Sequence, residues 1–136
     1  MKDILIPTSP GELVDKLTIL RLKAERIEDA GKLVNVAVER EALQRIADSA
    51  LPANDELALL REELYRINGD LWVIEDDIRA CEARGDFGPA FIALARAVYV
   101  TNDKRAEVKR RINRLLGSAL IEEKSYTDHG ARPGPE

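Results

Sequence analysis

The chain of 136 residues is poor in the residues that build disulfides, metal centres and aromatic cores. It contains one cysteine and one histidine, and aromatic residues make up 4% of it. A single cysteine cannot form a disulfide within the chain, and one cysteine with one histidine cannot supply a Cys/His zinc site. No apolar run has the length of a signal peptide core or of a membrane span. We therefore expect a cytoplasmic protein with no membrane partner.

Charged residues are abundant, and neither sign dominates. They form 34% of the chain against 45% hydrophobic residues, and the net charge is −4. This balance is typical of a folded helical domain and argues against nucleic acid as a partner. The length suits one domain with its own core. We expect a single helical domain over residues 1–126 and a disordered tail over 127–136, where glycine and proline accumulate.

Capping and breaking residues divide the chain into four expected helices. Ser9, followed by proline and then by Glu12, forms a capping box, and Asn54 is a second N-cap candidate. Gly117 marks the end of the last helix. Residues 3–6 form a short strand or an extended arm. The helices are expected over residues 10–29, 32–50, 54–84 and 89–116.

An apolar seam follows the third expected helix and is interrupted on the fourth. On the third helix, apolar residues recur at spacings of three and four, which is typical of a packed helix face. Residues 54–86 include ten acidic and four basic residues, and residues 87–116 include two acidic and seven basic residues. We therefore expect an all-α antiparallel bundle with a long hairpin of these two helices, in which Glu63 lies near Arg111 and Asp70 near Lys104. The seam residues are Leu57, Leu60, Leu64, Ile67, Leu71, Ile74, Ile78 and Cys81 on the third helix, and Phe91, Leu94, Val98, Val108, Ile112 and Leu115 on the fourth.

The interruption is polar. Thr101 and Arg105 occupy two seam positions of the fourth helix, and Asn68, Asp70 and Asn102 are expected beside them. A buried arginine needs an acidic or anionic partner. Three alternatives follow: the arginine lies in water, the five residues form a polar layer that fixes register or a dimer contact, or they line a pocket for an anionic small molecule.

Two pairs of carboxylates provide an alternative site. Glu12 and Asp15 lie one turn apart on the first helix, and Glu75 and Asp76 are adjacent on the third. Carboxylates one turn apart can share a magnesium ion, as in the all-α nucleotide pyrophosphatases. The denser E-E-x-x-E element that those enzymes carry ahead of the E-x-x-D is missing here. We expect no metal or cofactor, with magnesium as the alternative, and whether the protein is an enzyme stays open.

Three single residues on the third helix receive structural interpretations. Cys81 lies on the seam and is read as a small core residue. Trp72 flanks the seam and is read as the edge of the core or a dimer contact, with a ligand platform as the alternative. Gly69 is assigned to the outer face of the helix, where it costs about 1 kcal/mol relative to alanine and is simply tolerated, and the alternative is a close approach by another helix.

Four motifs carry a resemblance to a known family. They are Ser-Pro-Gly-Glu-Leu-Val-Asp-Lys-Leu-Thr-Ile-Leu over residues 9–20, Ile-Glu-Asp-Asp-Ile-Arg over 74–79, Asn-Asp-Lys-Arg over 102–105 and Glu-Glu-Lys-Ser-Tyr over 122–126. With these motifs the chain resembles an uncharacterised bacterial all-α family described only as a domain of unknown function. The resemblance covers most of residues 4–126 and implies no catalytic residues.

Composition, seam and resemblance together favour a cytoplasmic helical interaction or scaffolding domain. The long apolar seam indicates a homodimer, and another protein is a further partner that the helical surface would accept. The alternative is a small-molecule-binding protein or metal-dependent enzyme that uses the helix carboxylates and Arg105.

Overall fold

The computed structural model describes residues 1–129, and four helices account for the regular structure of this part of the chain. These helices are α1 (Pro10–Arg26), α2 (Ala30–Ala50), α3 (Asp55–Arg84) and α4 (Pro89–Leu115). The expected all-α bundle of four helices is confirmed. The predicted disordered tail over 127–136 lies mostly outside the described residues.

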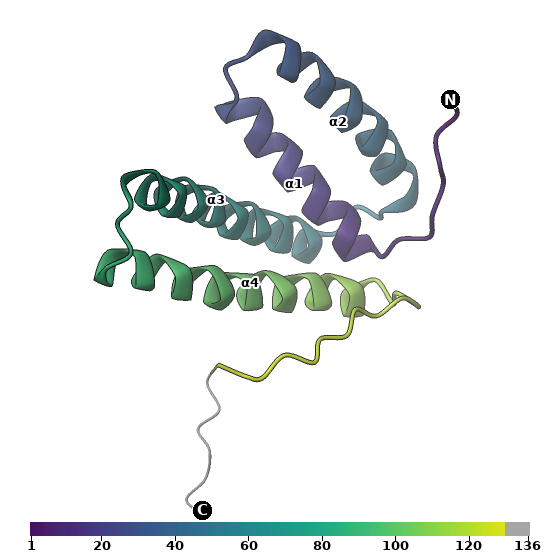
Figure 1. Ribbon diagram of the computed structural model, residues 1–136. Coiled ribbons are helices and arrows are strands. Elements are labelled where there is room, and N and C mark those ends of the chain that lie inside the picture. The colour runs from purple at the N-terminus through teal and green to yellow at the C-terminus, as the bar shows by residue number, and fades with distance from the viewer. Residues whose placement is uncertain (130–136) are drawn as a thin grey trace, which may run out of the picture.

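The helices form two layers (Figure 1). The α3–α4 hairpin is the longer layer, and its two helices make the most extensive pairing in the protein. α1 packs on this hairpin and touches both of its helices, whereas α2 packs mainly on α1 and reaches α3 through a hydrogen bond of Gln44 with Arg61. The first helix is therefore the central element, as its apolar residues on more than one side indicate.

The short strand expected over residues 3–6 is not formed, and the described residues 1–129 contain no strand. Ile4, Leu5 and Ile6 are 77%, 88% and 75% exposed. An isolated strand leaves its backbone groups without partners, and the structure places no second strand beside this arm.

Caps determine most of the helix boundaries. The Ser9 hydroxyl accepts a hydrogen bond from the Glu12 amide at 3.2 Å, and Asn54 caps α3 through the Leu57 amide at 2.9 Å, as predicted. Asp29 was assigned to the end of the first helix, but it caps the second, because its carboxylate accepts from the Lys32 amide at 2.8 Å. α1 consequently ends at Arg26, three residues earlier than expected.

The apolar core lies where α1 meets the base of the hairpin. Its central side chains are nearly inaccessible: Leu64 and Ile112 are 0% exposed, and Val14 is 1% exposed. A second, smaller cluster joins Leu17 of α1 to Ala47 of α2. The larger cluster comprises Val14, Leu57, Leu60, Leu64, Val108 and Ile112.

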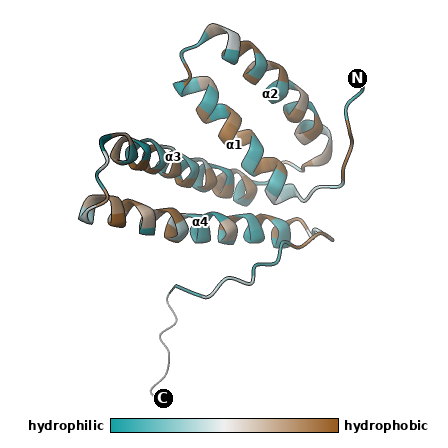
Figure 2. Ribbon diagram, in the orientation of Figure 1, coloured by the Kyte–Doolittle hydropathy of each residue, from teal (hydrophilic) through white to brown (hydrophobic). Residues whose placement is uncertain are grey.

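The hairpin of α3 and α4 divides into two halves, and α1 packs on only one of them. We call residues 55–71 with 101–115 the covered half, since α1 packs on them, and residues 72–84 with 89–100 the open half. Eleven residues of the covered half are buried, whereas Cys81 is the one buried residue of the open half. Figure 2 shows the same division by hydropathy: α4 is mainly brown near the α3–α4 turn and mainly teal toward its other end.

Gly69 does not lie on an outer face, so its sequence-based assignment is wrong. It is buried beneath α1, where an added Cβ would lie 3.4 Å from Arg26 Nη2 and 3.7 Å from Leu22 Cδ2.

The turn between α3 and α4 contains a second informative glycine. Gly85 ends α3 in the left-handed conformation with φ of 66°, a geometry that favours glycine.

Candidate functional site

Arg105 of α4 faces Asp15 of α1, across the interface between the two layers. Its Nε donates to Asp15 Oδ1 at 2.9 Å, and its Nη2 donates to Oδ2. The Asp15 side chain is 2% exposed and that of Arg105 is 29% exposed. This two-pronged contact satisfies a carboxylate that would otherwise be buried without a counterion, which is costly in a protein interior.

Asn68 of α3 completes the contact, so that three helices meet at one carboxylate. Its Nδ2 donates to Asp15 Oδ1 and to Thr18 Oγ1, both at 2.9 Å. The Thr18 hydroxyl donates in turn to the backbone carbonyl of Asp15 at 2.8 Å. The polar layer is therefore connected within one chain, as a buried polar group requires.

The network continues toward the N-terminus of α1. Lys109, one turn beyond Arg105, forms ion pairs with Glu12 and, at 3.1 Å, with Glu122. One turn further, Asn113 Oδ1 accepts a hydrogen bond from the Gly11 amide at 2.7 Å. This amide is one of the N-terminal donors that a helix cannot satisfy internally.

Neighbouring carboxylates keep the side chains of Arg105 and Lys109 positively charged. The hydrogen bond with Asp15 raises the pKa of Arg105 and outweighs the effect of burial, which acts in the opposite direction. For Lys109, burial acts to lower the pKa, but its hydrogen bonds with Glu12 and Glu122 exceed that effect and the pKa is raised. Each cation is thus held by carboxylates from outside its own helix.

Helical spacing explains why these residues meet. Arg105, Lys109 and Asn113 follow each other at intervals of four, so they share one face of α4. Asp15 and Thr18 are three apart and share one face of α1. The two faces oppose each other, and the sequence motif of residues 9–20 therefore carries an interhelical contact as well as a helix cap.

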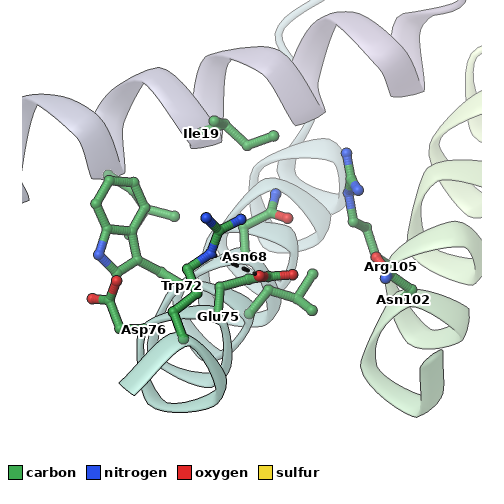
Figure 3. Close-up of a pocket in the computed structure, with 10 residues that line it drawn as sticks. Ile19, Asn68, Trp72, Glu75, Asp76, Asn102 and Arg105 are labelled. Atoms are coloured by element: carbon green, nitrogen blue, oxygen red, sulfur yellow. Dashed lines mark hydrogen bonds and ion pairs between the residues drawn. The ribbon is translucent and has the colours of Figure 1, made fainter. Parts of the chain in front are cut away.

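Beside this network, α1, α3 and α4 enclose an open groove of about 620 Å³ (Figure 3). Ile19 lies above it on α1, Trp72 on one side on α3, and Asn102 and Arg105 on the other side on α4. Arg79 of α3 also lines the groove, and its Nε donates to the carboxylate of Glu75 at 3.5 Å. The groove has the size that small-molecule sites in proteins usually have.

The structure brings some of the residues selected from the sequence together and separates others. Asn68, Asn102 and Arg105 line the groove, and Glu75 and Asp76 of α3 line it as well. Thr101 and Asp70 do not line it: Thr101 is buried and Asp70 is exposed. Glu63 pairs with Arg111 at 3.4 Å as predicted, whereas no such pair joins Asp70 to Lys104, both of which the structure describes.

The four carboxylates proposed for magnesium do not form one cluster. Glu12 and Asp15 are paired with Lys109 and Arg105, while Glu75 and Asp76 lie at the groove. Within residues 1–129, no three histidine, cysteine or carboxylate side chains are grouped in a way that could hold a metal ion.

Sequence reasoning missed the partner of Arg105 because it looked for that partner on α3. Asp15 and Thr18 are polar residues that interrupt a run of leucines and valines on α1, and this interruption was the available signal. Lys109 lies in a stretch of α4 rich in basic residues, yet it is only 7% exposed. Its spacing of four from both Arg105 and Asn113 was the signal that a second polar stripe faces another helix.

Comparison with known proteins identifies the family. The chain belongs to the family of unknown function DUF6165, which it matches over residues 4–136. No curated protein and no solved structure matches it significantly.

None of the four helices has the length and apolar character needed to cross a membrane, within the part of the chain that the structure describes.

Proposed function

We propose that the protein is a helical interaction domain that acts as a homodimer, and that the open half of the hairpin is the contact. One observation carries the proposal. Residues 89–101 of α4 contain a single charged residue, Arg96, yet of residues 89–100, all of which the structure describes, none is buried. Ile92 is 54% exposed and Tyr99 is 45% exposed.

The physical reason is that a helix with apolar residues on all sides belongs in an interior. In the open half α3 is the only helix that packs on α4, apart from which Tyr99 contacts the ring of His129, and two helices alone cannot enclose their shared seam. Ile78 of α3 and Leu94 of α4, both seam residues, are accordingly only half-buried. A second layer of helices is needed there, as α1 provides it in the covered half.

A second copy of the chain fits this surface better than a charged partner does. The exposed apolar residues of the open half belong mainly to α4, with Val73 on α3, whereas the charges belong mainly to α3, as in Glu75, Asp76 and Asp77. A two-fold contact of α4 with α4 buries uncharged surface on both sides and leaves the carboxylates in water. Ala93 and Ala97, one turn apart, allow the two backbones to approach closely.

Analytical ultracentrifugation over a range of concentrations tests the proposal. We expect a reversible dimer that Ile92→Lys converts to a monomer without loss of helical content. Val38→Lys is the matched control, because Val38 of α2 is 66% exposed and lies far from the contact. A wild-type chain that stays monomeric at every concentration, or a dimer that Ile92→Lys leaves intact, contradicts the proposal.

A cytoplasmic location and a bacterial origin belong to this proposal, as does the absence of nucleic-acid and membrane partners. The net charge of −4 supports the absence of nucleic acid. We assign no enzymatic step to the domain.

The antiparallel arrangement of the hairpin is also part of the proposal, and the short turn between Arg84 and Pro89 supports it.

A second candidate function is the binding of a small molecule in the groove beside Arg105. The specific observation in its favour is that five residues selected from the sequence as site candidates line one cavity: Asn68, Glu75, Asp76, Asn102 and Arg105. Trp72 is the only tryptophan of the chain and lines the same cavity, so its indole resonance reports on occupancy without interference. A fragment screen that never moves this resonance would dismiss the candidate.

A further inference from the structure

We infer that the groove between α1, α3 and α4 binds a neutral sugar ring, presented either as a free pyranoside or as the ribose of a nucleoside. The inference rests on the second candidate function and names its ligand class. Three features of the groove lead to it: compensated charge, unused hydrogen-bonding groups on two of its walls, and an indole beside them.

Charge compensation disfavours an ionic ligand. Arg105 is already paired with Asp15, and Arg79 is paired with Glu75. Asp76 remains as an acid at the groove, and the Arg26 guanidinium lies 5.9 Å from the centre of the neighbouring Trp72 ring. An anion would have to compete with Asp15 for Arg105, and that carboxylate is buried and held by three side-chain hydrogen bonds. The anionic ligand considered from the sequence is therefore replaced by a neutral one.

Unused polar groups remain on both sides of the groove. Asn68 is 5% exposed, and both hydrogen bonds of its side chain are donated by Nδ2, so that its acceptor, Oδ1, remains for a ligand at the groove. Arg105 uses Nε and Nη2 for Asp15, which leaves the donors of Nη1. Asn102, half-buried on α4, adds an amide with both a donor and an acceptor.

This combination matches neighbouring hydroxyls on a ring. Each hydroxyl both donates and accepts, so a pair of them can engage an amide or the edge of a guanidinium through two parallel bonds. Trp72 supplies an apolar surface for the C–H face of the ring, and Leu71 and Leu22 extend it. A groove of about 620 Å³ accommodates one such ring with its substituents.

The test follows the indole N–H resonance of Trp72 in ¹⁵N-labelled full-length protein. The probes are methyl glucoside, methyl galactoside and methyl mannoside as pyranosides, adenosine as a nucleoside, inorganic phosphate as an anion and spermidine as a cation. We expect a saturable shift with at least one pyranoside or with adenosine. Asn102→Ala should weaken that binding by about tenfold, the loss of one or two hydrogen bonds. Asn35→Ala, an exposed asparagine of α2, should leave it unchanged.

The outcomes separate the ligand class from the existence of the site. Saturation by a pyranoside identifies a free sugar, and saturation by adenosine but by none of the glycosides identifies a nucleoside. Saturation by phosphate or spermidine alone overturns the ligand class and leaves the second candidate function standing. No saturable shift with any probe at tens of millimolar overturns both. If the Trp72 resonance of the Asn102→Ala variant shifts with the same affinity as in the wild-type protein, the ligand lies outside the groove and the inference is overturned.

Discussion

The covered and open halves of the hairpin carry the same seam pattern but differ in what lies on it. In the covered half, α1 closes the seam, and Leu64 and Ile112 are 0% exposed. In the open half, Ile78 and Leu94 hold equivalent positions and are only half-buried. The spacing of apolar residues thus predicts which residues of two helices face each other. It does not predict how deeply they are buried, since this depends on a third helix.

The surface of α4 is polar in the half that α1 covers and apolar in the half that α1 leaves open. Where α1 is present, α4 offers Arg105, Lys109 and Asn113, and each binds a group from α1. Where α1 is absent, α4 offers alanine and isoleucine, and its Tyr99 contacts the ring of His129. Polar groups make a contact specific, and apolar groups without a partner in the chain indicate a partner outside it. This contrast is the basis of the proposed homodimer.

The sharpest test of the comparison is to truncate one seam leucine in each half. Leu64→Ala should lower the free energy of unfolding by about 3–4 kcal/mol, because it leaves a cavity in a closed core. Leu94→Ala should cost about 1 kcal/mol at low protein concentration, since its side chain is already half-exposed. Urea unfolding of the dilute proteins measures both. Equal losses would mean that the open half is packed as tightly as the covered half.

Removing the α1 carboxylate that binds the covered half, and then one carboxylate of the open half, gives the next largest contrast. Asp15→Ala should lower the free energy of unfolding by about 3 kcal/mol, because Arg105 and Asn68 lose their buried partner. Asp76→Ala, at an exposed position of the open half, should change it by no more than about 0.5 kcal/mol. Thermal unfolding at low and high salt provides the measurement. A small effect of Asp15→Ala would show that water replaces Asp15 and that the polar network contributes little.

The hairpin could be predicted from the sequence because its signals are local and repeated. The seam residues, the glycine-containing turn and the Asn54 cap all lie within the two helices that they define. Glu63 and Arg111 also pair as expected, because a short turn fixes which positions are opposite. The start of α1 was predicted for the same reason, since Ser9 caps an amide only three residues away.

The candidate site could be predicted only in part, because it depends on where α1 packs. Asn68, Asn102 and Arg105 were selected as polar residues that break an apolar pattern, and they line the groove. Asp15, the carboxylate that holds Arg105, lies 90 residues away in the chain, and no spacing rule joins them. Asp70 was chosen from the same stretch of α3 as Asn68 but is exposed, since α1 covers only one side of that helix.

Two glycines, Gly11 on α1 and Gly69 on α3, test how closely α1 must approach the hairpin, and they should respond in opposite directions. A Cβ on Gly11 would lie 2.6 Å from the Lys109 carbonyl oxygen and 2.9 Å from Asn113 Oδ1. Gly11→Ala must therefore push α1 away from α4, and we expect it to lower the free energy of unfolding by about 2 kcal/mol. A Cβ on Gly69 would meet Arg26 Nη2 at 3.4 Å, the end of a flexible side chain, and Leu22 at an ordinary contact distance of 3.7 Å. Gly69→Ala should therefore raise it by about 0.5 kcal/mol, because alanine favours the helix and the contact can adjust. Urea unfolding measures both changes, and a loss of stability in Gly69→Ala would mean that α1 approaches α3 as tightly as it approaches α4.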